Sequence, residues 1–84
     1  MNYETVYKNM TKKAKELGWT IESIHKKEDE LYIILAKRQG LFPERDYVVS
    51  YYDSNNKGFF WTVYDLTLKS ADRVFFNKIF EKIN

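Results

Sequence analysis

The sequence predicts a single α+β domain: a four-stranded antiparallel meander sheet preceded and followed by one helix, in the order α-β-β-β-β-α. Apolar residues recur at helical spacing near both ends of the 84-residue chain. Between these ends, alternating runs rich in aromatic and β-branched residues are separated by short polar turns, which is typical of a meander. We expect residues 1–84 to form one domain of two layers, with both helices on one face of the sheet.

The first helix is predicted from one stripe of apolar residues at offsets of three, four and seven. The stripe consists of Tyr3, Val6, Tyr7, Met10, Ala14 and Leu17. Asn2 is the expected N-cap, and Gly18 stands where a left-handed residue commonly ends a helix.

The first two strands are predicted at Trp19–Lys26 and Leu31–Arg38, joined by a polar turn. In the first strand Ile24 falls on the wrong face for the alternation, which a β-bulge or an early end would explain. The second strand is apolar on both faces, as is usual for a central strand.

The third and fourth strands are predicted at Tyr47–Tyr52 and Phe59–Leu66, joined by the polar turn 53–58. Both strands carry apolar side chains on both faces, so a helix, a second subunit or a partner must cover the second face. With both helices on one face, we expect the other face to be partly bare and aromatic. Strand register, which the sequence leaves open, decides which set of side chains faces outward.

The last helix is predicted to begin after a cap at Asp65, Thr67 or Ser70. Its apolar stripe contains Leu68, Ala71, Val74, Phe75, Ile79 and Ile83, widened by Phe76 and Phe80. This width predicts close packing on two sides of the helix.

Residue types exclude most catalytic chemistry. The chain has no cysteine and one histidine, His25, so thiolate nucleophiles, catalytic triads and His/Cys metal sites lack their residues. The three glycines form no phosphate-binding loop. We therefore predict a protein that is not an enzyme, with no catalytic residue, metal or cofactor. No apolar run is long enough to span a bilayer or serve as a signal peptide, so we expect a soluble cytoplasmic protein without membrane contact.

Nucleic-acid binding is the alternative function, although the net charge is only +2. Helix–strands–helix order resembles the double-stranded RNA-binding domain, whose first helix, a strand-connecting loop and the start of the last helix touch RNA. That resemblance implies contacts by Lys8, Lys12 and Lys15 at the first surface, Lys26 and Lys27 at the second, and Lys69 and Arg73 at the third. Glu28, Asp29 and Glu30 beside these lysines, and a missing basic run at the last helix, depart from the family. An aromatic face could instead stack single-stranded bases.

Protein binding is the main functional prediction, because it fits strands with two apolar faces best. The expected anchors are Tyr52, Phe60, Trp61 and Tyr64, with Asn55 and Asn56 contributing from the adjoining turn. The partner is another protein of unknown identity, and self-pairing into a homodimer is included in this prediction.

One segment, from Gly58 to Phe75, resembles a segment of small uncharacterised proteins of Gram-positive phages and mobile elements. It carries Gly58, Phe59, Phe60, Trp61, Tyr64, Asp65, Leu66, Thr67, Ala71 and Phe75. The resemblance implies an accessory role in which the protein binds and occludes a host machine, such as a defence nuclease.

Overall fold

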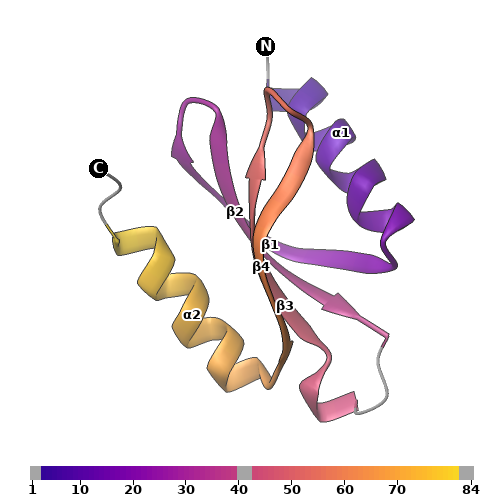
Figure 1. The fold of residues 1–84 in the computed structure, drawn as a ribbon, viewed down its shortest axis with the longest axis vertical. Helices are drawn as coiled ribbons and strands as arrows, with labels where there is room; N and C mark the ends of the chain where they lie inside the picture. Colours follow the sequence, from indigo (N-terminus) through magenta and orange to yellow (C-terminus); the bar gives the residue numbers. More distant parts are fainter. Residues whose placement is uncertain (1–2, 40–42, 82–84) are drawn as a thin grey trace.

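The computed structural model describes residues 3–39 and 43–81, and their elements follow the predicted order (Figure 1). They are α1 (Tyr3–Glu16), β1 (Trp19–Glu28), β2 (Leu31–Arg38), the short 3₁₀ helix η1 (Pro43–Arg45), β3 (Tyr47–Asp53), β4 (Gly58–Leu66) and α2 (Leu68–Phe80). The strands form one antiparallel sheet in the order β1-β2-β3-β4. The predicted α+β class and meander are confirmed.

The two helices lie on opposite faces of the sheet, so the prediction of two layers with both helices on one face is wrong (Figure 1). Alternate residues of β2 prove the point: Tyr32 and Ile34 join the core under α1, whereas Ile33 and Leu35 join the core under α2. Successive strand residues point to opposite faces. The molecule therefore has three layers, and each apolar face of the central strands has its own helix.

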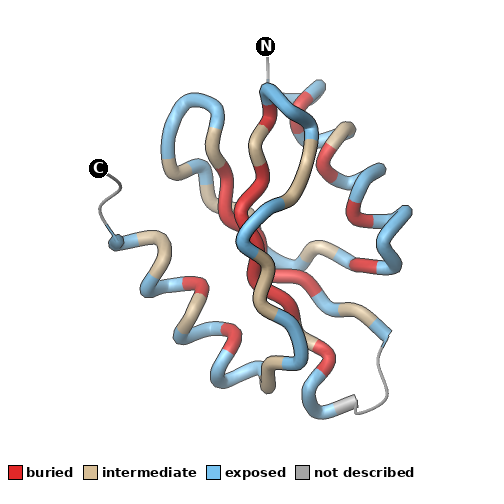
Figure 2. Tube along the Cα trace, viewed as in Figure 1, coloured by how far each residue is buried: buried red, intermediate tan, exposed pale blue. Residues whose placement is uncertain are grey.

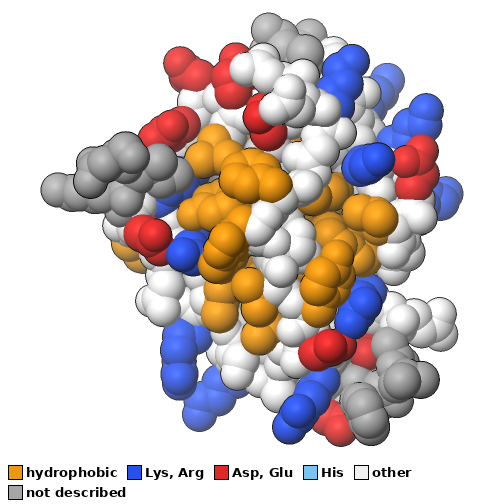
Figure 3. All heavy atoms as spheres, in the orientation of Figure 1, with side chains coloured by type: hydrophobic (Ala, Val, Ile, Leu, Met, Phe, Trp, Pro, Cys, Tyr) orange, Lys and Arg blue, Asp and Glu red, His pale blue; other side chains and the backbone are white. Residues whose placement is uncertain are grey.

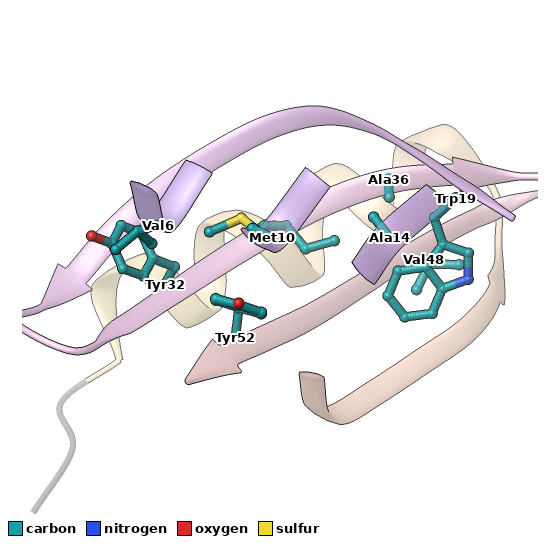
Figure 4. Close-up of a cluster of buried hydrophobic side chains, with 9 residues drawn as sticks. Val6, Met10, Ala14, Trp19, Tyr32, Ala36, Val48 and Tyr52 are labelled. Atoms are coloured by element: carbon teal, nitrogen blue, oxygen red, sulfur yellow. The ribbon is translucent and has the colours of Figure 1, made fainter. Parts of the chain in front are cut away.

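The α1-side core holds nine buried residues, which come from α1 and from strands β1, β2 and β3 (Figure 4). Val6, Met10 and Ala14 form the buried stripe of α1. Trp19 of β1 lies in this core beside Ala36 and Val48, and its ring reaches Phe59 of the distant strand β4 at 4.9 Å between centroids. The indole therefore connects the two edge strands, β1 and β4, on the α1 side of the sheet.

The α2-side core joins the last helix to the middle of the sheet. Ala71 and Phe75 of α2 pack with Ile33, Leu35, Val49 and Tyr51. Phe76 and Phe80 lie outside this core and are exposed, so the prediction that α2 packs closely on two sides is wrong for the described chain.

Burial follows position in the sheet (Figure 2). Five consecutive residues are buried in each of the central strands, Tyr32–Ala36 in β2 and Val48–Tyr52 in β3. Within β4, all of which is described, no side chain is buried. β2 is a central strand, as its two apolar faces predicted.

Two bulges interrupt β4. Its pairing with β3 gains one residue between the Val49↔Val63 and Tyr51↔Phe60 pairs, and another between Tyr47↔Leu66 and Val49↔Val63. Each extra stretch contains a residue with positive φ, Trp61 at 51° and Asp65 at 58°. Left-handed residues of this kind are characteristic of β-bulges. The bulges break the simple alternation that the sequence predicted for this strand. In β1, the predicted irregularity is confirmed by a register shift between Ile21 and Ser23.

The helix ends are fixed by local contacts. Gly18 has φ of 80°, as expected for a left-handed residue after α1. Of the three candidate caps of α2, Thr67 is the N-cap, and its hydroxyl accepts a 3.1 Å hydrogen bond from Ser70 N. At the other end, Lys27 Nζ donates to the carbonyls of Lys78, Ile79 and Glu81. The predicted N-cap at Asn2 and the predicted stripe residue Ile83 lie outside the described residues.

Candidate functional site

The candidate site runs along β4, the edge strand that exposes aromatic side chains on both faces. Figure 3 shows hydrophobic side chains gathered on both sides of the backbone of this strand. Phe60, Trp61 and Tyr64 are each between 43% and 46% exposed. We call these three residues the β4 surface. Its rings are half-covered by neighbouring side chains, so they are accessible but held in place.

Phe60 and Trp61 share the α2 side of the sheet because of the first bulge. Phe60 stacks on Tyr51 with 5.3 Å between ring centroids and an interplanar angle of 17°. Trp61 lies 5.4 Å from the same tyrosine ring, and Lys78 Nζ lies 4.2 Å from the Trp61 ring centroid. Without the extra residue, alternation would send these neighbours to opposite faces.

A buried serine supports this bulge from β3. Ser50 Oγ lies 3.2 Å from the carbonyl oxygen of Phe60 and 2.9 Å from Thr62 Oγ1. These two residues flank Trp61, so the hydroxyl of Ser50 links β3 to both sides of the bulge. Ser50 therefore helps to hold Trp61 in its left-handed conformation.

Tyr64 lies on the α1 side of β4. Its ring meets Trp19 edge-on, 6.0 Å between centroids, and the guanidinium of Arg38 lies 4.6 Å above its ring centroid. Arg38 Nη2 also donates to Asp65 Oδ1 at 2.5 Å. Asp65, the second left-handed residue of β4, thus fixes the cation that covers Tyr64.

On each side of β4, the cation that contacts an exposed ring is itself paired with a carboxylate. Lys78 Nζ lies 2.7 Å from Glu81 Oε2, and this hydrogen bond lowers the pKa of Glu81 below its ordinary value. Burial raises the pKa of Tyr51, while the nearby Lys78 charge opposes that rise. The β4 surface therefore presents aromatic rings in a nearly charge-balanced setting.

The turn before β4 is organised by Asp53. Its carboxylate accepts hydrogen bonds from the backbone N–H of Asn55 and Asn56, and from Asn56 Nδ2 at 2.8 Å. An open hollow of 280 Å³ next to this turn is lined by Asp53, Asn56, Gly58, Phe59 and Phe60. The predicted site residues Asn56 and Phe60 are thus brought together, and Asn55 stands exposed beside them.

Two predictions about the site need correction. Tyr52, expected as an exposed anchor, is 0% exposed in the α1-side core, because its strand face is covered by that helix. The bare aromatic sheet face does not exist either, since Phe60 and Tyr64 flank one edge from opposite sides. The contributions of Arg38 and Lys78 were missed. Both are distant in sequence from β4, and no local pattern connects them to it.

The lysines of the alternative nucleic-acid site do not form one surface. Lys8, Lys12 and Lys15 are exposed on α1, opposite its buried stripe. Lys27 instead reaches the carbonyl end of α2 on the other side of the sheet. At the hairpin ends, an open hollow of 590 Å³ is lined by Glu28, Asp29, Glu30, Leu31, Asp53 and Asn55. These carboxylates oppose a phosphate backbone near β4.

The described residues contain no group of three or more His, Cys, Asp or Glu side chains placed to hold a metal ion. His25 is half-buried on β1. Neither α1 nor α2 has the length and apolar character that crossing a bilayer requires. Comparison of the chain with family models, with curated proteins and with solved structures finds no match.

Proposed function

We propose that this protein is a binding module that contacts a protein partner through the β4 surface and the turn before it. The observation that carries the proposal is an edge strand with three half-exposed aromatic residues and no buried one. Large exposed aromatic groups that are rimmed by polar residues are typical of interaction sites.

Rigidity of the rings supports this proposal. Phe60, Trp61 and Tyr64 each contact another aromatic ring or a cation in the free chain. A side chain that is already fixed loses less conformational entropy when a partner binds. Such rings supply contact area at low entropic cost, as they do in antibody paratopes.

Electrostatics favour a protein over a nucleic acid as the partner. Arg38 and Lys78, the cations that touch exposed rings of β4, are both paired with carboxylates. Binding to a phosphate backbone would require free cations. An accessory role in occluding a host machine, as the phage-protein resemblance implies, is compatible with this mode of contact and belongs to the same proposal.

The test is capture of partners by matched variants of the tagged protein. A triple variant, Phe60→Ser, Trp61→Ala and Tyr64→Ala, removes the β4 surface. The control, Phe76→Ala with Phe80→Ala, removes two exposed aromatic residues of α2. Both must keep the circular dichroism spectrum of the wild type. We expect a protein retained by the wild type and the control to be lost from the triple variant. Capture of the same proteins by all three forms contradicts the proposal.

A second arm tests the alternative partner. Trp fluorescence is titrated with single- and double-stranded RNA and DNA at about 50 and about 200 mM salt, because phosphate contacts weaken steeply over this range. We expect no binding at either salt concentration. Binding that is lost at high salt and abolished by Lys8→Glu, Lys12→Glu and Lys15→Glu would transfer the function to α1.

A further inference from the structure

We propose that α2 forms a second, separate interface, through which two copies of this chain associate as an antiparallel, two-fold symmetric pair. The starting observation is the outward face of α2, which is not used by the core. Phe80 is 80% exposed and Phe76 is 54% exposed, the former being the most exposed of the large apolar side chains described. This face lies outside the β4 surface, and its test is independent of the proposed function.

Four exposed residues form a seam along this face. They are Lys69, Arg73, Phe76 and Phe80, and all four are exposed. Their spacings of four, three and four residues are those of a coiled-coil seam, so their side chains form one row on the helix. The two cations occupy the N-terminal half of the seam and the two aromatic rings occupy the C-terminal half.

This division makes the seam complementary to itself in one orientation only. In an antiparallel pair with its two-fold axis between Val74 and Phe75, Lys69 faces Phe80 of the second copy and Arg73 faces Phe76 of the second copy. Symmetry repeats both contacts, so each of the four rings receives a cation. In the same register, Asn77 faces Ser70 of the second copy on one flank of the seam and Asp72 faces Ile79 on the other, so no like charges oppose each other. A parallel pair would instead place lysine on lysine and arginine on arginine.

The cations are available for this role. Within the described chain, Lys69 and Arg73 have no carboxylate within ion-pair distance, in contrast to Lys78 and Arg38. Two cations without an ion-pair partner therefore lie on the same row as two exposed rings, one of which, Phe76, also meets the buried ring of Phe75 edge-on. This charge complementarity selects a second copy as the occupant.

The size of the contact predicts a weak dimer. Helix α2 has 13 residues and is about 20 Å long, so a pair of such helices buries less than a standard protein interface of roughly 1,600 Å². We expect a reversible association with a dissociation constant on the order of 100 μM.

Sedimentation velocity from about 10 μM to about 1 mM tests this interface, over the range in which such an affinity becomes visible. The key variant is Arg73→Glu, with Lys12→Glu on α1 as its control, because both lower the net charge from +2 to 0. Lower net charge promotes non-specific association. If Arg73→Glu loses association and Lys12→Glu does not, the loss is therefore due to the position of Arg73 and not to the change in net charge. We expect dimerisation about ten-fold weaker or more in Arg73→Glu and in Phe80→Ala, and unchanged in Lys12→Glu.

Three results would overturn the interface. One is a monomeric wild type at every concentration. Another is equal behaviour of Arg73→Glu and Lys12→Glu. The third is loss of association in Trp61→Ala but not in Arg73→Glu, which would assign self-association to the β4 surface. Failure to capture a different protein through the β4 surface leaves this interface unaffected.

A cysteine experiment tests the register, because the natural chain has no cysteine. Ser70→Cys and Asn77→Cys place thiols at exposed positions on the same flank of the seam, which face each other across the proposed pair. A mixture of the two variants should form the mixed disulfide faster than either variant forms its own disulfide. Equal rates in all three samples would rule out the antiparallel register.

Discussion

Strands β3 and β4 are neighbours of similar apolar content, but they differ in how far their side chains are buried. β3 buries five consecutive residues, from Val48 to Tyr52, whereas β4 buries none. β3 has a strand on each side and a core on each face. β4 has one neighbouring strand, and its aromatic side chains remain half-exposed on both faces. The contrast teaches that apolar composition identifies a strand, while its place in the sheet decides whether its side chains stabilise the fold or remain accessible to a partner.

The same two strands also differ in the regularity of their pairing. β3 pairs with β2 residue by residue without interruption, whereas β4 carries two bulges with left-handed residues. Bulges in an edge strand twist it and protect it from pairing with other chains through its backbone. We therefore assign recognition on β4 to its side chains and not to its backbone.

The largest expected effect compares one aromatic residue from each strand. Tyr52→Ala removes a 0% exposed ring from the α1-side core and should lower the free energy of unfolding by about 3–5 kcal/mol. Trp61→Ala removes a half-exposed ring and should lower it by about 1 kcal/mol or less. Urea unfolding measures both values. Equal losses would show that β4 contributes to the core as β3 does, and would remove the basis of the β4 surface.

Much of the fold could be predicted because helical and strand periodicities are local. The element order, the central position of β2 and the irregularity in β1 all follow from spacing. The face of the sheet that each helix covers does not follow from spacing, because β2 and β3 are apolar on both faces and either helix can cover either face. Six consecutive apolar residues in the second strand, Leu31–Ala36, nevertheless signal burial on both faces. Two helices covering one face each satisfy that signal better than two helices sharing one.

The candidate site was harder to predict for a different reason. Phe60, Trp61 and Tyr64 are exposed as the hypothesis required, but Tyr52 is buried, because strand register and helix placement together assign each alternate residue to a face. The bulge at Trp61 moves that ring beside Phe60, and no sequence pattern marks a tryptophan that will adopt φ of 51°. Arg38 and Lys78 reach β4 only through the tertiary fold.

The second prediction concerns the helix that covers one face of β3. Lys27 Nζ donates to three carbonyls at the end of α2, where a cation also interacts favourably with the helix dipole. Lys27→Met should therefore lower the free energy of unfolding by about 2 kcal/mol. Lys26→Met is the control, because Lys26 is an exposed neighbour of the same charge. Hydrogen exchange should accelerate in the last turn of α2 only in the first variant, and equal effects of the two substitutions would contradict the role of Lys27.

The third prediction tests the backbone of β4. A left-handed conformation costs a residue with a side chain about 1–2 kcal/mol relative to glycine, whereas glycine in a regular strand costs about 0.5–1 kcal/mol relative to alanine. Trp61→Gly should thus be at least as stable as Trp61→Ala. Tyr64, equally exposed on the same strand but without positive φ, is the control. There the glycine variant should be less stable than the alanine variant. The same order of stability at both positions would mean that the bulge stores no strain.

The smallest expected effect comes from removing the hydroxyl oxygen of Tyr52. The Tyr52 hydroxyl is buried and finds no hydrogen-bond partner in the described structure, so Tyr52→Phe should leave stability at neutral pH unchanged or raise it by up to about 1 kcal/mol. Burial, followed by the charge of Asp53, raises the pKa of Tyr52 above its ordinary value.

The sign of the pH effect follows from that shift. The pKa of Tyr52 is higher in the folded state than in the unfolded state. The unfolded state therefore binds fewer protons than the folded state once the pH exceeds the ordinary tyrosine value of about 10. The wild type should therefore lose stability as the pH rises beyond this value, and Tyr52→Phe should lose less. Tyr51 has a raised pKa as well, so part of the alkaline loss must persist in the variant. Urea unfolding at neutral and alkaline pH measures the difference. A variant less stable than the wild type at neutral pH would show that this hydroxyl does have a partner, and that β3 is bound into its core by more than apolar packing.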